Sequence, residues 1–200
     1  MDLSTTYLGM RLAHPIVPGA GPMADDLDTV KRLEDAGAPM IVMRSLFEEQ
    51  LIEEQLAAHH TFDSSSHLSA EATSFLPVPH GLALGPEEYL EQLRRIVETV
   101  GVPVVASLNG TSPGGWLEFS RLMEQAGASA LELNVYQLST DPEDSAGDLE
   151  ERIVSMVRSV KAQVEIPIAV KLSPFFSSLV HFARRLETAG ADGLILFNRF

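Results

Sequence analysis

Charged and amide side chains stand at the ends of short apolar runs in this sequence, and they are the first candidates for chemistry. Lys171 lies in the run Ile168–Leu172, where an ammonium group is costly to bury without an anionic partner. One interpretation pairs Lys171 with a carboxylate such as Glu132. The other gives it a ligand phosphate, a ligand carboxylate or the electron-rich edge of a ring. Arg44 follows the run Met40–Met43 in the same way, with a surface position as its alternative.

Three asparagines extend this pattern, because Asn109, Asn134 and Asn198 each end an apolar run. An amide group can both donate to and accept from the edge of a heteroaromatic ligand. The alternative for each asparagine is a cap on a turn or on the next helix. Three asparagines at equivalent places make three separate caps the weaker explanation. Gly19 and Gly21 follow another short apolar run, and glycine lets the backbone approach a ligand closely.

Other kinds of site find little support in the sequence. It contains no cysteine, which excludes disulfides, thiolate metal sites and a thiol nucleophile. Four histidines lack the spacing of metal ligands, so no metal site is expected at His59, His60, His67 or His80. Neither the serine-nucleophile motif Gly-x-Ser-x-Gly nor a phosphate-binding Walker motif is present.

A unit that recurs along the chain must position these residues: a helical stretch, a turn of small residues, and then a short apolar run. The turn often contains a glycine, which suits the left-handed conformation that ends many helices. The pattern predicts five helices, over Asp26–Ala36, Pro86–Val100, Ser112–Ala126, Leu149–Val164 and Ser178–Ala189. It predicts six strands, at Ile16–Val17, Met40–Met43, Val104–Leu108, Ala130–Leu133, Ile168–Leu172 and Leu194–Phe197.

Unbroken apolar strands that alternate with helices indicate a parallel sheet covered by helices, and therefore an α/β fold. A doubly wound open sheet and a TIM-type (β/α)8 barrel both fit this alternation. Polar residues at successive strand ends favour the barrel, as does the lack of a Gly-x-Gly-x-x-Gly motif after the first strand. Six strands leave the barrel incomplete, so two further strands are expected beyond Phe200. Residues 1–200 are expected to form a single domain, the N-terminal two-thirds of a barrel, with a long loop insertion at about 45–85.

The charge balance limits the partners. Fourteen basic against 28 acidic residues give a formal net charge of −14. Such a charge repels phosphate backbones and anionic membranes, so neither nucleic acid nor a membrane is an expected partner. No run approaches the ~18 apolar residues of a transmembrane helix, and the N-terminus lacks the features of a secretory signal. A cytoplasmic protein is therefore expected.

Several of these runs resemble motifs of one enzyme family. The segment 8–21 resembles a family opening of the form L-G-x-x-x-x-N-P, with His14 at the place of the asparagine. Residues 131–134 resemble the strand end E-L-N, residues 167–174 resemble P-x-x-V-K-L-x-P, and residues 190–198 resemble G-A-D-G-x-x-x-x-N. In order and spacing the match runs along the whole chain. The sequence therefore resembles the dihydroorotate dehydrogenases, in particular their soluble, FMN-dependent class.

The resemblance implies a flavoprotein oxidoreductase with bound FMN, which oxidises (S)-dihydroorotate to orotate in pyrimidine biosynthesis. It implies that Lys171 and Arg44 take part in catalysis. The residues that it assigns to the cofactor are Gly19, Ala20, Gly21, Arg44, Asn109, Asn134, Lys171 and Asn198. The partner is then a small-molecule substrate, and a homodimer is an assembly that the resemblance allows.

Three departures from the family pattern leave other functions open. The proton-abstracting residue of the family falls at Gln137, and glutamine cannot act as a general base near neutral pH. The family lysine after the second strand is Arg44, and the asparagine-rich substrate segment is absent from 75–85. Ser139 is a remaining hydroxyl candidate for the base. The alternatives are a flavin-binding barrel subunit that is inactive or has another substrate, and a phosphate-binding barrel enzyme unrelated to flavin.

Overall fold

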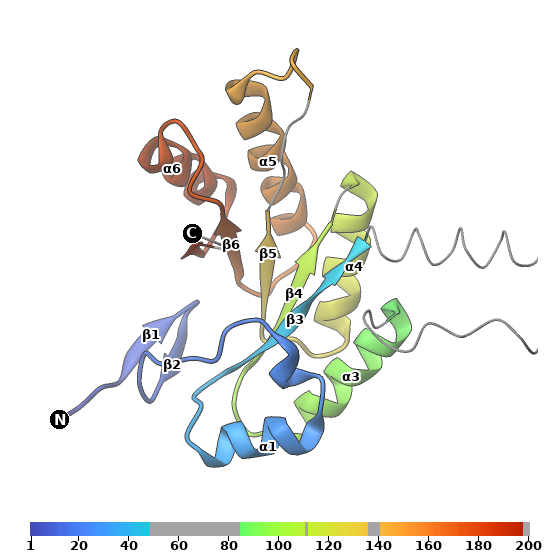
Figure 1. Cartoon of the computed structure of the whole chain (residues 1–200), viewed down its shortest axis with the longest axis vertical. Coiled ribbons are helices and arrows are strands. Elements are labelled where there is room, and N and C mark those ends of the chain that lie inside the picture. Colours follow the sequence, from blue (N-terminus) through green and yellow to red (C-terminus); the bar gives the residue numbers. More distant parts are fainter. Residues whose placement is uncertain (49–84, 111, 136–140, 198–200) are drawn as a thin grey trace, which may run out of the picture.

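The computed structural model describes residues 1–48, 85–110, 112–135 and 141–197. Five parallel strands form a sheet in the order β3-β4-β5-β6-β7, and β1 and β2 form a separate antiparallel hairpin (Figure 1). The strands are β1 (Thr5–Tyr7), β2 (Met10–Leu12), β3 (Ile41–Phe47), β4 (Val104–Asn109), β5 (Ala130–Asn134), β6 (Ile168–Leu172) and β7 (Gly193–Leu196). The helices are η1 (Pro22–Ala24), α1 (Leu27–Asp35), α3 (Pro86–Thr99), α4 (Pro113–Gln125), α5 (Ala146–Lys161) and α6 (Leu179–Ala189). The predicted α/β fold with a parallel sheet is confirmed.

All five predicted helices form, with ends within a few residues of the predicted ones. Asp26, Ser112 and Ser145 begin three of them, because each side chain accepts a hydrogen bond from a backbone N–H of the first turn. Gly127 and Gly190 follow the ends of α4 and α6 with φ angles of 97° and 109°. Glycine adopts this left-handed conformation without steric cost, which explains why the small-residue turns mark helix ends correctly.

The two faces of the sheet differ, because side chains alternate between them along each strand. On the helix-covered face, residues such as Leu133 and Val170 belong to the main hydrophobic core. On the opposite face, Val105 and Ala130 belong to a smaller cluster, and the β1–β2 hairpin packs there through side chains such as Leu8. No helix of the described ranges covers this second face, and we call it the open face.

A histidine anchors the chain between the hairpin and α1. His14 Nε2 lies 2.8 Å from the carbonyl oxygen of Gly37, and His14 Nδ1 accepts a hydrogen bond from the Ile16 N–H at 3.3 Å. These bonds tie the N-terminal segment to the loop between α1 and β3. The imidazole thus has a structural role at the position where the family motif has asparagine.

The first predicted strand, Ile16–Val17, does not form. These residues join no ladder in the described sheet, and the Ile16 side chain is 75% exposed. Pro15 and Pro18 on either side have no N–H to donate, which disfavours a strand there. The described sheet therefore has five parallel strands rather than six, and it does not close on itself.

The second predicted strand is longer than expected. The prediction ended it at Met43, whereas β3 continues to Phe47. The predicted loop insertion at about 45–85 therefore begins later than expected, and its greater part, 49–84, lies outside the described residues.

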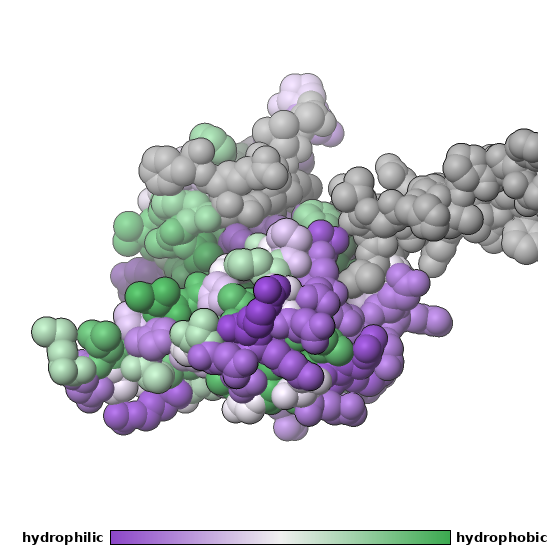
Figure 2. All heavy atoms as spheres, turned by 60° about the horizontal axis from the view of Figure 1, so that its bottom comes forward, coloured by the Kyte–Doolittle hydropathy of each residue, from purple (hydrophilic) through white to green (hydrophobic). Residues whose placement is uncertain are grey.

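Figure 2 shows hydrophilic side chains over α1 and α3, with hydrophobic side chains gathered toward the hairpin and the C-terminal elements. The exposed apolar residues include Phe175, Val180 of α6 and Leu196 of the edge strand β7. No helix in the described ranges combines the length and apolar character that crossing a bilayer requires.

Candidate functional site

The open face carries a row of polar side chains toward the C-terminal ends of its strands. Alternation places Ser107 and Asn109 of β4 on this face, because the intervening residues belong to the helix-side core. Glu132 and Asn134 of β5 and Lys171 of β6 follow by the same argument. Ser107 is the register partner of Glu132, and Asn134 that of Lys171. We call these five residues the polar row.

Lys171 and Glu132 form an ion pair across β5 and β6. Lys171 Nζ lies 3.0 Å from Glu132 Oε1, and the two side chains are only 14% and 5% exposed. Of the two interpretations of Lys171, the structure shows the one with a carboxylate partner. Desolvating two charges offsets most of what such a pair contributes to stability, so stability alone does not account for it. An ammonium group has three N–H donors, and this bond uses one of them.

A chain of hydrogen bonds supports Glu132 from the β4 side. Ser107 Oγ donates to Glu132 Oε1 at 3.4 Å and lies 2.8 Å from Ser45 Oγ of β3. The Tyr89 hydroxyl accepts from the Ser107 N–H at 3.0 Å and donates to the Ser107 carbonyl oxygen at 3.2 Å. The Tyr89 hydroxyl thus satisfies the backbone groups of Ser107 beside the place where the β3–β4 register shifts, between Val42 and Ser45 of β3. Burial raises the pKa of the Tyr89 phenol above its ordinary value, so the group stays neutral further into the alkaline range.

Asn134 is the member of the polar row whose acceptor is unpaired. Its side chain is buried, and its Oδ1 accepts no hydrogen bond from the described residues. A buried acceptor without a donor costs about 1–3 kcal/mol, so a ligand N–H would be favoured there. Asn109 ends the neighbouring strand, so the structure brings Asn109, Asn134 and Lys171 together at the ends of three adjacent strands. Asn198, the third predicted asparagine, lies outside the described residues.

Arg44 does not follow its strand, contrary to the prediction. It lies within β3, at the register shift, and its guanidinium Nη2 is 3.1 Å from Asp25 Oδ2. Burial raises the pKa of Asp25, and the positive charge of Arg44 opposes that rise. The pair joins β3 to the segment before α1. The register shift escaped the sequence prediction because it depends on the pairing of two strands.

The predicted backbone contact region, Gly19 to Gly21, lies on the open face. Ala20 packs against the same small cluster as the hairpin, which places the segment there. No atom of the described residues lies within 4 Å of the point where a Cβ on Gly19 would be. A Cβ on Gly21 would have the Gly19 carbonyl oxygen as its nearest neighbour, at 3.8 Å. Among the described residues, no side chain therefore covers the Cβ positions of these two glycines.

A buried glutamate binds at the N-terminus of α4. The Glu48 carboxylate accepts hydrogen bonds from the Ser112 N–H at 2.9 Å and from the Ser112 hydroxyl. Ser112 Oγ in turn accepts from the Gly115 N–H at 2.9 Å. A negative charge is favoured at a helix N-terminus, where the backbone N–H groups point outward. The contact joins the chain after β3 to the start of α4.

Sequence reasoning missed Ser107, Tyr89 and Glu48. A strict period-two reading of β4 would have placed Ser107 beside Asn109 on one face. Tyr89 has no comparable signal, because it reads as an ordinary core residue of an amphipathic helix. Glu48 is one of several acidic residues in its stretch, and nothing local distinguishes it.

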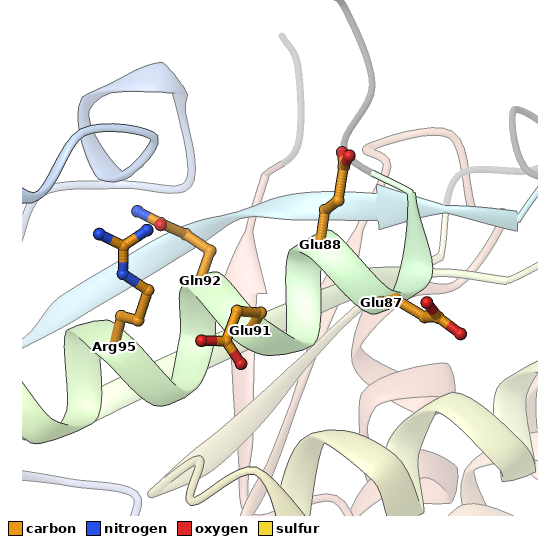
Figure 3. A pocket seen from close by; sticks show the side chains of 5 residues that line it. All are labelled: Glu87, Glu88, Glu91, Gln92 and Arg95. Carbon is orange, nitrogen blue, oxygen red and sulfur yellow. The ribbon is translucent and has the colours of Figure 1, made fainter.

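A surface hollow lies on α3. Its five lining side chains come from this single helix (Figure 3): Glu87, Glu88, Glu91, Gln92 and Arg95. The Gln92 side chain donates to the carbonyl oxygens of Ala24 and Asp25, which is a packing role. Among the described residues, no buried polar atom without a partner belongs to the side chains that line this hollow, so we assign it no function. Within the described ranges, no group of three or more His, Asp or Glu side chains could hold a metal ion.

Comparison with curated proteins gives relatives along nearly the whole chain. The dihydroorotate dehydrogenase B (NAD(+)) catalytic subunit of Endomicrobium trichonymphae is 25% identical over 214 residues, which cover 100% of this chain and 62% of that protein. The corresponding subunit of Methanothermobacter thermautotrophicus is 28% identical over 199 residues, with coverages of 98% and 61%. The NAD-dependent dihydropyrimidine dehydrogenase subunit PreA of Escherichia coli K12 is 26% identical over 204 residues, with coverages of 98% and 48%. No protein-family model matches the sequence.

These relatives confirm the resemblance to dihydroorotate dehydrogenases that the motifs predicted, and they are oxidoreductases by name. The chain spans about three-fifths of the length of the dihydroorotate dehydrogenases and about half that of the dihydropyrimidine dehydrogenase subunit.

Solved structures of barrel enzymes share the fold. Phosphonopyruvate hydrolase, in complex with oxalate and Mg²⁺, matches with a TM-score of 0.58 at 20% identity, over 92% of this chain and 59% of that one. Dihydrodipicolinate synthase from Acinetobacter baumannii matches with a TM-score of 0.52 at 17% identity, over 86% and 47%. At these identities the likeness concerns the fold alone.

Proposed function

We propose that this protein binds FMN at the polar row and oxidises (S)-dihydroorotate to orotate, a step of pyrimidine biosynthesis, in the cytoplasm. One observation carries the proposal: Asn134 and Lys171 are register partners at the ends of β5 and β6, and the buried amide oxygen of Asn134 has no donor among the described residues. The dihydroorotate dehydrogenases among the relatives support the reaction. We also propose that residues 1–200 act as one domain and that the protein forms a homodimer.

The residues present fit a flavin ring. The pyrimidine edge of the ring alternates carbonyl oxygens with an N–H group. The unpaired Asn134 Oδ1 suits that N–H, and the remaining donors of Lys171 suit a carbonyl oxygen. On the same face, no described side chain covers the Cβ positions of Gly19 and Gly21, so their backbone allows the close approach that a planar ring needs.

FMN, when bound, supplies the acceptor for the hydride that leaves the substrate. The chain supplies charge and orientation: Lys171 and Arg44 carry positive charge, and the amides of Asn109 and Asn134 orient the ring and the substrate. Dihydroorotate must lose a proton as well as a hydride. The family position for that proton transfer is Gln137, which cannot accept a proton near pH 7, so Ser139 is the hydroxyl candidate of this chain. Both residues lie outside the described ranges.

Gln137 also favours a second candidate function. A flavin-binding barrel subunit that is inactive, or that acts on a different substrate, needs the cofactor contacts of the polar row but no base for dihydroorotate. The dihydropyrimidine dehydrogenase subunit among the relatives supports this candidate, because its name indicates another pyrimidine substrate.

Purified protein tests both functions. We expect a yellow preparation with flavin absorption bands, and FMN in the supernatant after heat denaturation, identified by mass spectrometry. Dihydroorotate under anaerobic conditions should then bleach the flavin, with dithionite as the positive control. Bleaching by dithionite alone would favour the second candidate. A colourless protein that takes up no added FMN would contradict both.

A matched pair of lysine variants tests the place of binding. Lys171→Gln should weaken FMN binding by about 10- to 100-fold, because a hydrogen bond to a charged group contributes about 1.5–3 kcal/mol. Lys161→Gln is the control, since Lys161 pairs with Asp192 just before β7, at the opposite ends of the strands. Equal FMN affinity of the two variants would remove Lys171 from the site. Fluorescence titration of FMN measures both.

A further inference from the structure

We propose that Glu132 sets the position and the effective charge of Lys171, and that it thereby lowers the reduction potential of the bound cofactor. The inference rests on the proposed FMN site and goes beyond it, because it assigns a role to a carboxylate that faces no ligand contact in that proposal. Glu132 is in this sense a positioning residue, which acts through Lys171.

The geometry supports a role in positioning. Lysine has a flexible side chain, yet Lys171 Nζ is held 3.0 Å from Glu132 Oε1 with only 14% of the side chain exposed. Glu132 itself is buried and accepts a second hydrogen bond on the same oxygen from Ser107 Oγ, at 3.4 Å.

The support behind Glu132 is rigid as well. Ser107 is held on its backbone by two hydrogen bonds to the buried Tyr89, and on its hydroxyl by Ser45. The ammonium group is thus fixed through a continuous set of bonds that spans β3, β4, β5 and α3. Such support locks a charged side chain in the orientation that a ligand requires.

The charge of Glu132 has a second consequence. Two opposite charges 3.0 Å apart largely cancel at a distance, so a ring beside Lys171 experiences less positive potential than an unpaired ammonium group would give. Two-electron reduction adds negative charge to a flavin ring, and positive potential favours that form. The Glu132–Lys171 pair therefore favours the oxidised cofactor relative to a site with Lys171 alone.

Two variants separate position from charge. Glu132→Gln keeps the shape and an oxygen acceptor for Lys171 but removes the negative charge. Glu132→Ala removes both. In the cofactor-free protein, acetylation of Lys171 by an N-hydroxysuccinimide ester, followed by peptide mass spectrometry, reports how well the amine is held.

We expect Glu132→Ala to label several-fold faster at Lys171 than wild type, with an unchanged rate at Lys161. Lys161 is an internal control because its own partner, Asp192, is intact, and Asp192→Asn is the matched variant that should raise labelling at Lys161 only. Equal Lys171 labelling in Glu132→Ala and wild type would overturn the positioning role. Should Glu132→Ala fail to fold, the comparison of Glu132→Gln with wild type in the next experiment decides the proposal.

The midpoint potential of bound FMN tests the charge. Glu132→Gln should favour the reduced cofactor by about tenfold, which corresponds to a rise of about 30 mV for a two-electron couple. Lys171→Gln should lower the potential, because it leaves the charge of Glu132 unopposed, and the double variant, which lacks both charges, should lie between the two single variants. A purely structural Glu132 would leave the potential unmoved, and that result would overturn the proposal. Wild-type protein that binds no FMN would contradict the proposed function and the potential effect together, while the labelling experiment would still decide the positioning role.

Discussion

The carboxyl group of Glu48 occupies the space that a side chain on Gly115 would need. A Cβ added to Gly115 would overlap the carboxyl carbon and both oxygens of Glu48, which is itself buried. Gly115 stands in the first turn of α4, two residues after Pro113. Because residue 115 is a glycine, the Glu48 carboxylate has room at the N-terminus of this helix. The two adjacent glycines therefore differ, because a Cβ on Gly114 would not meet the Glu48 carboxylate.

Gly115→Ala should destabilise the protein by about 1–3 kcal/mol, because the added methyl group displaces Glu48 from the start of α4. Gly114→Ala is the matched control, since the nearest atom to its Cβ would be Ser112 Oγ at 4.0 Å. Alanine favours the helix over glycine, so Gly114→Ala should be up to about 1 kcal/mol more stable than wild type. Urea unfolding followed by circular dichroism measures the stability of both variants. A Gly115→Ala variant more stable than Gly114→Ala would contradict the role of Glu48.

Tyr89→Phe should destabilise the protein by about 1–3 kcal/mol at pH 7. The change keeps the buried ring but leaves the Ser107 N–H and carbonyl oxygen without their partner at the register shift. The slope of the urea transition should stay unchanged, because the surface exposed on unfolding is nearly the same. A stability equal to that of wild type would mean that water replaces the phenol there.

The same tyrosine predicts the behaviour of the protein at high pH. Burial raises the pKa of Tyr89 in the folded state above its unfolded value of about 10. The stability that follows from a raised pKa is fully present below the unfolded pKa and is lost as the pH rises through the folded one.

The free energy of unfolding should therefore fall as the pH rises above about 10, and fall less steeply in Tyr89→Phe. Part of the slope should persist in that variant, because burial and the charge of Glu132 also raise the pKa of Tyr7. Urea unfolding at a series of alkaline pH values, with tyrosinate absorbance as a second signal, tests this. Identical slopes would show that Tyr89 ionises in the folded protein as readily as in the unfolded one.

Asn134→Leu should separate stability from binding. Leucine has a similar shape but no buried acceptor, so the cofactor-free variant should be as stable as wild type or more stable, by up to about 1–3 kcal/mol. FMN binding should weaken at the same time, because the amide is lost. Thermal unfolding with and without FMN measures both effects. Loss of stability together with unchanged FMN affinity would assign Asn134 to the core instead of the site.

Local signals in the sequence predicted most of the elements and several residues of the site. Helix starts and ends depend on a few neighbouring residues, so Asp26 and Gly190 predicted them correctly. Strand runs are likewise local, apart from Ile16–Val17, which has the composition of a strand but joins no ladder in the described sheet. Lys171 and Asn134 could be singled out because a polar residue in or at the end of an apolar strand is conspicuous within a short window.

The partners of these residues, in contrast, follow from the assembled fold. Glu132 and Lys171 are 39 residues apart, and the register of two parallel strands brings them together. The register shift of β3 places Arg44 inside a strand and gives Tyr89 a role between strands, although no local pattern marks either. Hydrogen bonds between distant segments depend on register and packing, which are properties of the assembled sheet. The sequence therefore identified the candidate lysine, and the assembled sheet identified the carboxylate that holds it.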